Sequence, residues 1–356
     1  MARYALILAG GRGTRFWPRS RTKRAKQVLE FLGAGSLIRH TVDRLRAVVP
    51  PERVWVLTNR HLCDEIAGQI PEIPRGQIIA EPAQRNTAPP IGLAARILGE
   101  QDPDAVMGVF PADHYIARPA AFLKIVRAAY KAAEQRQMAL IGIQPRWAET
   151  GYGYLEFPRK VKAGALQAER VVRFREKPDL KTAKRFVRTG RFAWNAGMFF
   201  WRTDVFRGAL REHLPKTALL LESLPAFGSE GFDTALADVF PRCENISVDY
   251  AVLEKASNVV AFAAGDIGWN DVGSWNAVYE LLPKDPGGNA VRGDALFVEA
   301  KRNYVDSQGK LVAVLGLSDL VVVDTPDALL ITTRERAQQV GDVVKALESA
   351  KVTELL

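Results

Sequence analysis

Tyr4-Ala5-Leu6-Ile7-Leu8-Ala9-Gly10-Gly11-Arg12-Gly13-Thr14-Arg15 is an apolar run that passes directly into a glycine-rich turn. The apolar residues predict a buried strand. The three glycines let backbone N–H groups close around an anion, and Arg15 and the later Lys26 supply positive charge. We therefore predict a strand that leads into a phosphate-binding loop, with a plain strand-to-helix turn as the alternative.

The loop differs from two better-known phosphate-binding motifs. Phe16 stands where a dinucleotide-binding fingerprint has its third glycine, and no Gly-Lys-Ser/Thr follows at the spacing of a Walker P-loop. The sequence thus supports neither a dinucleotide site nor a P-loop ATPase. A nucleoside triphosphate remains the predicted ligand.

The composition is that of an ordinary soluble globular protein. The chain has 356 residues, 47% hydrophobic and 25% charged, enough for a large core and a smaller second unit. No segment approaches the roughly 18 apolar residues of a membrane span, and the start lacks a signal segment, so we expect no membrane association and a cytoplasmic location. Cys63 and Cys243 form no ligand pattern and are expected to be reduced.

The formal net charge of +9 raises the question of nucleic-acid binding. Basic residues cluster directly after the glycine loop, without any recognised nucleic-acid module. A small anionic substrate explains this charge more economically, and a solvated surface accounts for Arg19 and Arg21. We predict that the chain does not bind nucleic acid.

Strand-like and helical patterns alternate through the first three quarters of the chain. Helical spacing of apolar residues after Pro119 marks one amphipathic crossover helix. Such alternation predicts an α/β fold with a doubly wound, mostly parallel sheet, whose ligands bind at the carboxyl ends of the strands. The further strands are expected at residues 53–58, 77–80, 105–110 and 139–143.

A polar, glycine-rich stretch at residues 284–289 separates the alternating strands and helices from a region of short β-rich runs. We predict a catalytic domain over residues 1–284 and a small β-rich domain over 285–356. Thr332 and Glu335 have the spacing of a capping box for a last helix. Because the small domain contains no obvious chemical cluster, we expect it to act in assembly or shielding. Its strands are expected at residues 295–298, 311–315, 320–323 and 328–331.

Polar segments follow two of the expected strands. Glu81, Asn86 and Thr87 lie where a strand gives way to a helix, and they could read a guanine base or merely cap that helix. Asp113 ends another strand, a position suited to Mg²⁺, with a turn residue as the alternative. We interpret the adjacent His114 as a hydrogen-bonded structural neighbour, because magnesium prefers oxygen ligands.

Later segments offer groups for a sugar phosphate. Gly153 allows close backbone approach, Glu176 and Asn195 can bond sugar hydroxyls, and Lys177 can meet a phosphate. Each of these segments could instead have a structural role, as an edge strand, a surface ion pair or a buried amide. Asp271 is a candidate second carboxylate for the metal, whereas Trp269 and Trp275 are expected to pack in the core or at its rim.

Seven motifs in order resemble those of the bacterial mannose-1-phosphate guanylyltransferase family, a branch of the sugar-nucleotide pyrophosphorylases, over nearly the entire chain. Three of these motifs contain the candidate site residues Gly153, Asn195 and Asp271. The motifs are residues 8–15 with Lys26, Glu81-Pro82 with Arg85-Asn86-Thr87, Pro111-Ala112-Asp113-His114, Gly151-Tyr152-Gly153-Tyr154, Glu176-Lys177-Pro178, Trp194-Asn195-Ala196-Gly197-Met198-Phe199, and Asp271-Val272-Gly273-Ser274-Trp275.

The resemblance implies a nucleotidyltransferase domain and a small C-terminal domain of left-handed β-helix character. It implies GTP and mannose 1-phosphate as substrates, GDP-mannose as product and Mg²⁺ as cofactor on Asp113 and Asp271. Arg15, Lys26 and Lys177 would be catalytic, and Gly153, Glu176 and Asn195 would face the sugar. The nucleotide would be bound by Leu8, Ala9, Gly10, Gly11, Gly13, Thr14, Glu81, Asn86, Thr87 and Asp113.

Some features stay open or depart from the family. The chain resembles the short form without a fused isomerase, so that second activity is expected to be absent. A homodimer is the candidate assembly. Ala25 replaces the family's usual proline before Lys26, and Phe16 replaces leucine; we expect the first change to loosen the approach to Lys26. Another sugar phosphate or nucleotide, or a catalytically silent nucleotide-sugar sensor, is the alternative function.

Overall fold

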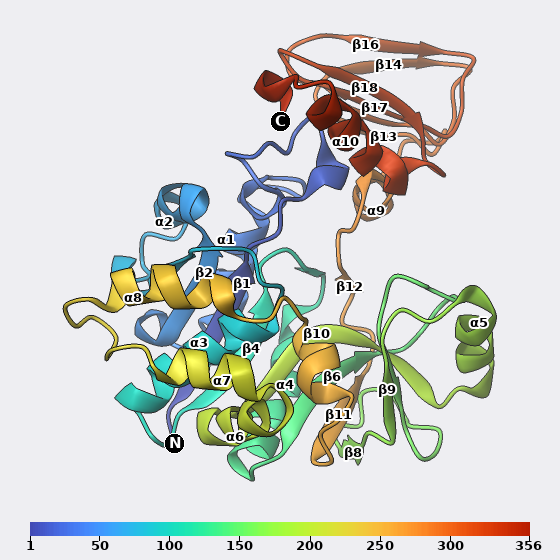
Figure 1. Ribbon diagram of the computed structural model, residues 1–356. Coiled ribbons are helices and arrows are strands. Elements are labelled where there is room, and N and C mark those ends of the chain that lie inside the picture. The colour runs from blue at the N-terminus through green and yellow to red at the C-terminus, as the bar shows by residue number, and fades with distance from the viewer.

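The computed structural model describes all of residues 1–356 and contains a large mixed sheet, flanked by helices, with a smaller β-rich part above it (Figure 1). Strands of the large sheet run in the order β3-β2-β1-β4-β10-β6-β11-β8. The strands are β1 Arg3–Ala9, β2 Val54–Asn59, β3 Ile78–Glu81, β4 Val106–Pro111, β6 Met138–Ile143, β7 Tyr154–Glu156, β8 Ala168–Arg170, β9 Arg173–Arg175, β10 Phe192–Arg202 and β11 Val259–Ala264.

The sheet is mixed and contains two sets of parallel strands, which the alternation of strands and helices predicts. Strand β1 pairs in parallel with β2 and β4, and β6 pairs in parallel with β11. The long strand β10 runs antiparallel between β4 and β6. Its register shifts between Asn195 and Phe199, and this irregularity opens the strand at the segment that contains Gly197.

Two helical layers cover the sheet because successive side chains of a strand point to opposite faces. Ala5 and Ile7 of β1 belong to one core with α1, α2, α4 and α5, whereas Leu6 belongs to a second core with α3, α6, α7 and α8. The helices are α1 Leu37–Leu45, α2 Cys63–Gln69, α3 Ala88–Gln101, α4 Pro119–Glu134, α5 Leu180–Thr189, α6 Thr203–His213, α7 Pro215–Glu222, α8 Phe232–Val239, α9 Trp275–Leu281 and α10 Gly341–Ser349. None of them combines the length and apolar character needed to cross a bilayer.

The C-terminal part coils in the manner of a β-helix. Successive parallel strands stack in the order β13-β15-β17, and β14 pairs in parallel with β16, so the chain returns to the same face on each turn. Strand β18 closes the stack antiparallel to β17. These strands are β13 Ala290–Arg292, β14 Ala295–Val298, β15 Tyr304–Asp306, β16 Val312–Leu315, β17 Leu320–Asp324 and β18 Leu329–Thr333.

The predicted capping box at Thr332 is wrong. Thr332 lies within β18 and pairs with Val321, so the strand extends through it, and α10 begins only at Gly341 without a side-chain cap. Pairing along the whole length of β17 therefore outweighs the local capping signal.

The β-helix part packs on the segment that follows the glycine loop. Phe16 and Phe31 share a buried core with Trp275, Tyr304 and Val321. The indole N–H of Trp17 donates to the Leu355 carbonyl (2.9 Å), and that of Trp275 donates to the Trp17 carbonyl (3.1 Å). The two parts of the chain are thus fastened together next to the predicted phosphate loop.

The expectation that Arg19 and Arg21 lie on a solvated surface is wrong. Arg19 is buried and forms an ion pair with the buried Asp306 (2.9 Å), and Arg21 pairs with Asp327 (3.0 Å). Burial of Arg19 is possible because its guanidinium meets a carboxylate of the β-helix part. Arg19 and Arg21 of the basic cluster therefore link the two parts of the chain.

Candidate active site

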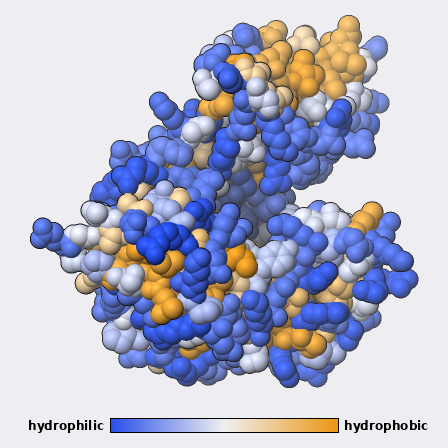
Figure 2. Space-filling view, in the orientation of Figure 1, coloured by the Kyte–Doolittle hydropathy of each residue, from blue (hydrophilic) through white to orange (hydrophobic).

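One large cleft, of about 1360 Å³, opens at the carboxyl ends of the strands, beneath the β-helix part (Figure 2). Fifteen of the seventeen predicted site residues line it, whereas Lys26 and Lys177 do not. The lining set is Leu8, Ala9, Gly10, Gly11, Gly13, Thr14, Arg15, Glu81, Asn86, Thr87, Asp113, Gly153, Glu176, Asn195 and Asp271.

The glycine loop forms one wall of the cleft with unused hydrogen-bond donors. The backbone N–H groups of residues 10–13 donate to no acceptor in the protein. Gly13 adopts φ 67°, and a Cβ there would lie 2.4 Å from Cβ of Lys26, so glycine alone lets the loop pass over the lysine. The loop is anchored from below, since the Asn59 side-chain amide donates to the Gly10 carbonyl (2.9 Å). Such a row of free N–H groups suits an anion.

The two departures from the family pattern are both buried under this loop. Ala25 has φ −74°, a value that proline also adopts, and its N–H makes no hydrogen bond. Phe16 packs against Phe31 and Trp275 with ring centroids 4.7 and 5.2 Å away. The Lys26 ammonium lies 5.6 Å from the centre of the Phe16 ring. The segment is therefore held by packing without the proline.

Two loop arginines contact the C-terminal segment. Arg15 donates to the side-chain oxygen of Gln338 (2.7 Å), and Arg12 pairs with Glu348 of α10 (2.8 Å). Gln338, Asp342, Lys345 and Glu348 all line the cleft. Sequence reasoning assigned no chemistry to this segment, because nothing in its local pattern shows which part of the chain it meets.

Glu81 lines the cleft at the end of β3. Its carboxyl group makes no ion pair or side-chain hydrogen bond, and burial raises its pKa to about 8. Asn86 has φ 58°, and the Thr87 hydroxyl accepts the N–H of Val248 (2.9 Å) and does not cap α3. An unpaired, buried acid is costly unless a ligand supplies donors.

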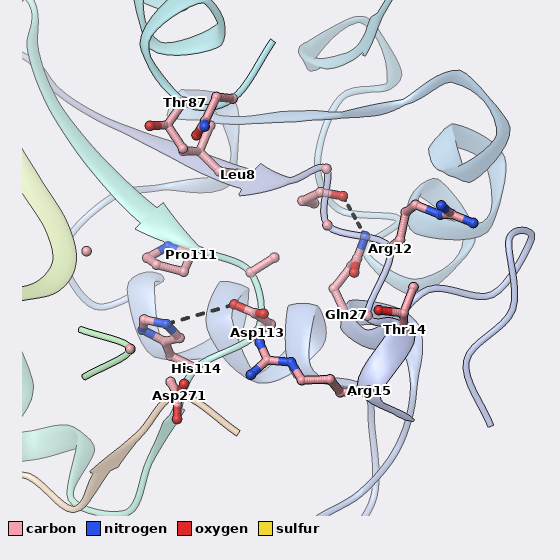
Figure 3. Close-up of a pocket in the computed structure, with 18 of the residues that line it drawn as sticks. Leu8, Arg12, Thr14, Arg15, Gln27, Thr87, Pro111, Asp113, His114 and Asp271 are labelled. Atoms are coloured by element: carbon pink, nitrogen blue, oxygen red, sulfur yellow. Dashed lines mark hydrogen bonds and ion pairs between the residues drawn. The ribbon is translucent and has the colours of Figure 1, made fainter. Parts of the chain in front are cut away.

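Two carboxylates, those of Asp113 and Asp271, lie near His114, and Figure 3 shows Arg15 reaching toward Asp113. The Lys26 ammonium donates to Asp113 Oδ2 (2.8 Å) and to the Asp271 carbonyl (2.7 Å). Burial alone would raise the pKa of Asp113, but Lys26 and His114 bring it below its ordinary value. The Tyr152 hydroxyl donates to Asp271 Oδ1 (2.8 Å).

This arrangement fits a divalent cation bound partly by substrate. No group of three or more acidic, histidine or cysteine side chains gathers as a metal cage. Mg²⁺ commonly takes one or two carboxylates and completes its shell with phosphate oxygens and water. His114 accepts the indole N–H of Trp269 at Nδ1 (3.2 Å), and burial lowers its pKa, in accord with a structural neighbour.

The predicted sugar-facing residues lie on a third wall. A Cβ on Gly153 would lie 2.4 Å from Glu176 Oε2, so the glycine makes room for that carboxylate. Lys177 sits at the rim with φ 42°, pairs with Glu176 (3.2 Å) and is 62% exposed. The amide of Asn195 donates to Asp249 Oδ1 (3.0 Å), a residue that sequence reasoning did not single out.

The sheet and the cleft together define a nucleotidyltransferase. A model of the nucleotidyl transferase family matches residues 4–286, and one described as the MannoseP isomerase/GMP-like beta-helix domain matches residues 293–347. A mannose-1-phosphate guanylyltransferase of Escherichia coli is 36% identical over 353 residues, which cover 98% of this chain and 74% of the relative. The chain belongs to the mannose-1-phosphate guanylyltransferase family. Nucleotidyltransferases of this family generally use a divalent metal ion.

Other comparisons agree. The xanthan biosynthesis protein XanB of Xanthomonas campestris pv. campestris (strain B100) is 39% identical over 350 residues, 97% of this chain and 73% of that protein. A crystal structure from Thermus thermophilus, described as a mannose-1-phosphate geranyltransferase, has a TM-score of 0.87 at 32% identity and covers 98% of this chain and 100% of its own. A UDP-glucose pyrophosphorylase structure, at 17% identity, TM-score 0.51 and coverage of 79% of this chain and 97% of its own, shares the fold alone.

Proposed function

We propose that the chain transfers a guanylyl group from GTP to mannose 1-phosphate, yielding GDP-mannose and pyrophosphate. The observation that carries the proposal is that a single cleft collects free loop N–H groups, an unpaired acid at a strand end, two carboxylates and a polar wall. Each of these suits one part of the reaction: triphosphate, base, metal and sugar.

The reaction requires an oxygen of the sugar phosphate to attack the α-phosphorus of GTP, while the bond from that phosphorus to the β-phosphate oxygen breaks. A phosphate monoester is already anionic at neutral pH, so no general base is needed. Repulsion between the two anions is the main obstacle. Groups that bring positive charge and fix geometry are therefore expected to dominate catalysis.

The chain's own residues would meet this need from three sides. The N–H groups of Gly10, Gly11 and Gly13 and the Arg15 guanidinium would bind the triphosphate. Lys26 holds the Asp113 carboxylate in place, and its charge adds to that of Arg15. Lys177 would turn from Glu176 to the sugar phosphate. Asp113 and Asp271 would hold Mg²⁺, which when bound neutralises phosphate charge.

Base recognition would fall to Glu81, Asn86 and Thr87. A guanine presents N1–H and its exocyclic amine as adjacent donors, and a carboxylate can accept both. Adenine offers no such pair to Glu81, so GTP is the favoured nucleotide. In the view of Figure 3, Thr87 lies away from Asp113, so a base beside Thr87 would be separated from the metal.

The proposal is tested by pyrophosphate release. GTP, ATP, UTP and dTTP are each combined with mannose, glucose and N-acetylglucosamine 1-phosphates in the presence of Mg²⁺ and the purified chain. Release confined to GTP with mannose 1-phosphate supports the proposal. Release with a different pair assigns another sugar nucleotide, and no release with any pair favours the silent sensor.

A further inference from the structure

Asp249 is an acidic residue of the cleft that no motif brings to attention. It begins a π-helical turn, Asp249–Leu253, whose Ala251, Val252 and Leu253 are buried in the sheet's helical layer. The preceding N–H, that of Val248, donates to the Thr87 hydroxyl (2.9 Å). The carboxyl group is thus presented to the cleft from a braced segment.

The contacts of Asp249 fix the orientation of Asn195. Asp249 Oδ1 accepts the Asn195 side-chain amide (3.0 Å), while Asn195 Oδ1 accepts the N–H of Gly197 (3.1 Å). With one amide hydrogen and the oxygen each held, the second amide hydrogen has a defined direction. Gly197 can serve this role in the irregular part of β10 because it adopts φ 66°.

The environment of Asp249 is costly for a purely structural acid. No cation forms an ion pair with it, whereas Glu176 is a neighbouring carboxylate in the same cleft. Burial, with repulsion from Glu176, raises the pKa of Asp249 to about 7. Two acids and an amide from separate elements converge on one wall, a pattern more typical of a ligand site than of packing.

The charge of this wall selects the kind of ligand group. Without a cation between them, two carboxyl groups repel phosphate oxygens, so this wall suits neither the triphosphate nor the sugar phosphate. Hydroxyl groups donate hydrogen bonds, and their bonds to carboxylates are stronger than those between neutral groups. The hydroxyl-bearing part of a sugar is the portion of the substrates that fits.

We propose that Asp249 accepts a hydrogen bond from a hydroxyl group of the sugar, orients Asn195 toward the same ring, and thereby determines which sugar phosphate is used. This inference rests on the proposed function. Sites built to hydrogen-bond a hydroxyl discriminate strongly against a substrate that lacks it or presents it differently, because the buried polar group is left unpaired.

The variant Asp249→Asn tests the role with little change in shape, since an asparagine oxygen still accepts the amide of Asn195. Asp238→Asn, on the exposed face of α8, is the matched control. We expect KM for mannose 1-phosphate to rise at least about tenfold, with KM for GTP within about twofold of the parent value. The preference for mannose over glucose 1-phosphate should fall with it, and the control should behave as the parent.

The outcomes separate the inference from the function on which it rests. An active parent chain whose Asp249→Asn variant keeps its KM for the sugar phosphate and its sugar preference overturns the inference alone. Equal losses for both substrates together with a lowered melting temperature indicate a structural role and also overturn it. An inactive parent chain overturns the proposed function and the inference with it.

Discussion

The unpaired carboxyl group of Glu81 should make the proposed binding of GTP dependent on pH. Burial raises its pKa to about 8, so the acid holds a proton at neutral pH in the free protein. A guanine with two donors needs the ionised form as acceptor. Binding must therefore remove the proton, and the affinity for GTP should rise as the pH approaches 8.

The magnitude follows from the fraction ionised. With a pKa of about 8, roughly 1% of the group is ionised at pH 6, about 10% at pH 7 and about half at pH 8. Each tenfold change in this fraction costs about 1.4 kcal/mol of binding free energy. The dissociation constant for GTP should fall about tenfold from pH 6 to pH 7 and about fivefold more by pH 8.

Isothermal titration calorimetry of GTP with the parent chain and with Glu81→Gln measures this effect. Titration of the triphosphate itself is common to both proteins, so the ratio of their dissociation constants isolates Glu81. The ratio should be near 1 at pH 6, where the acid is protonated and resembles glutamine, and should reach tens at pH 8. In two buffers of different ionisation enthalpy, the parent should release close to one proton at pH 7.

The raised pKa of Glu81 also makes the stability of the fold depend on pH. Below about pH 4.5 the acid is protonated in both the folded and the unfolded chain. Between that value and 8 only the unfolded chain ionises freely, so the stability contributed by the protonated acid is lost as the pH rises through this window. Glu81→Gln should therefore gain in unfolding free energy over the parent between pH 5 and pH 8.

A ratio of the GTP affinities of the two proteins that stays constant across pH would refute the assignment of Glu81 to the guanine base.

Four further changes have expected outcomes. Asp113→Ala should lower turnover by at least about 100-fold in a chain that still folds, whereas Asp64→Ala at the surface should not lower it; full activity would remove the metal assignment. Ala25→Pro should stabilise the chain by about 0.4–1 kcal/mol in urea denaturation, because its φ suits proline and its N–H is unused; destabilisation would contradict this. Asp306→Ala should lower the free energy of unfolding by about 3–5 kcal/mol, because it leaves Arg19 buried and unpaired. The double variant Arg19→Met with Asp306→Leu should recover most of this loss. Equal losses for the single and double variants would show that the unpaired charge is not the cause. Glu348→Ala removes the partner of Arg12 and should lower KM for GTP severalfold with stability changed by less than about 1 kcal/mol; a raised KM would mean that Glu348 assists binding.

The first strand and its loop could be predicted from sequence because their signals are local. Tyr4 to Leu8 form the apolar run of a central strand, and Gly13 is required by a close approach to Lys26 that leaves no room for a side chain. The strands at residues 53–58, 105–110 and 139–143 likewise agree with β2, β4 and β6 to within a residue. Alternating apolar patterns and turn residues determine such features directly.

The features that sequence reasoning missed depend on contacts between distant segments. Arg19 meets Asp306 across 287 positions, and Arg12 meets Glu348 across 336. Thr332 has a capping pattern, yet it pairs with Val321 in a strand. Asp249 carries no spacing signal, since its partners Asn195 and Glu176 come from other elements. In each case tertiary packing decides the environment, which a single sequence does not display.

Following the α-phosphate of GTP is the most direct test of guanylyl transfer to mannose 1-phosphate. The purified chain is incubated with Mg²⁺, mannose 1-phosphate and GTP labelled with ³²P at the α-position or, in a parallel reaction, at the γ-position, and the products are separated by chromatography. Guanylyl transfer should place the α-label in GDP-mannose and the γ-label in pyrophosphate. An α-label that stays in GTP, or a γ-label released as inorganic phosphate with GDP as the other product, would contradict guanylyl transfer.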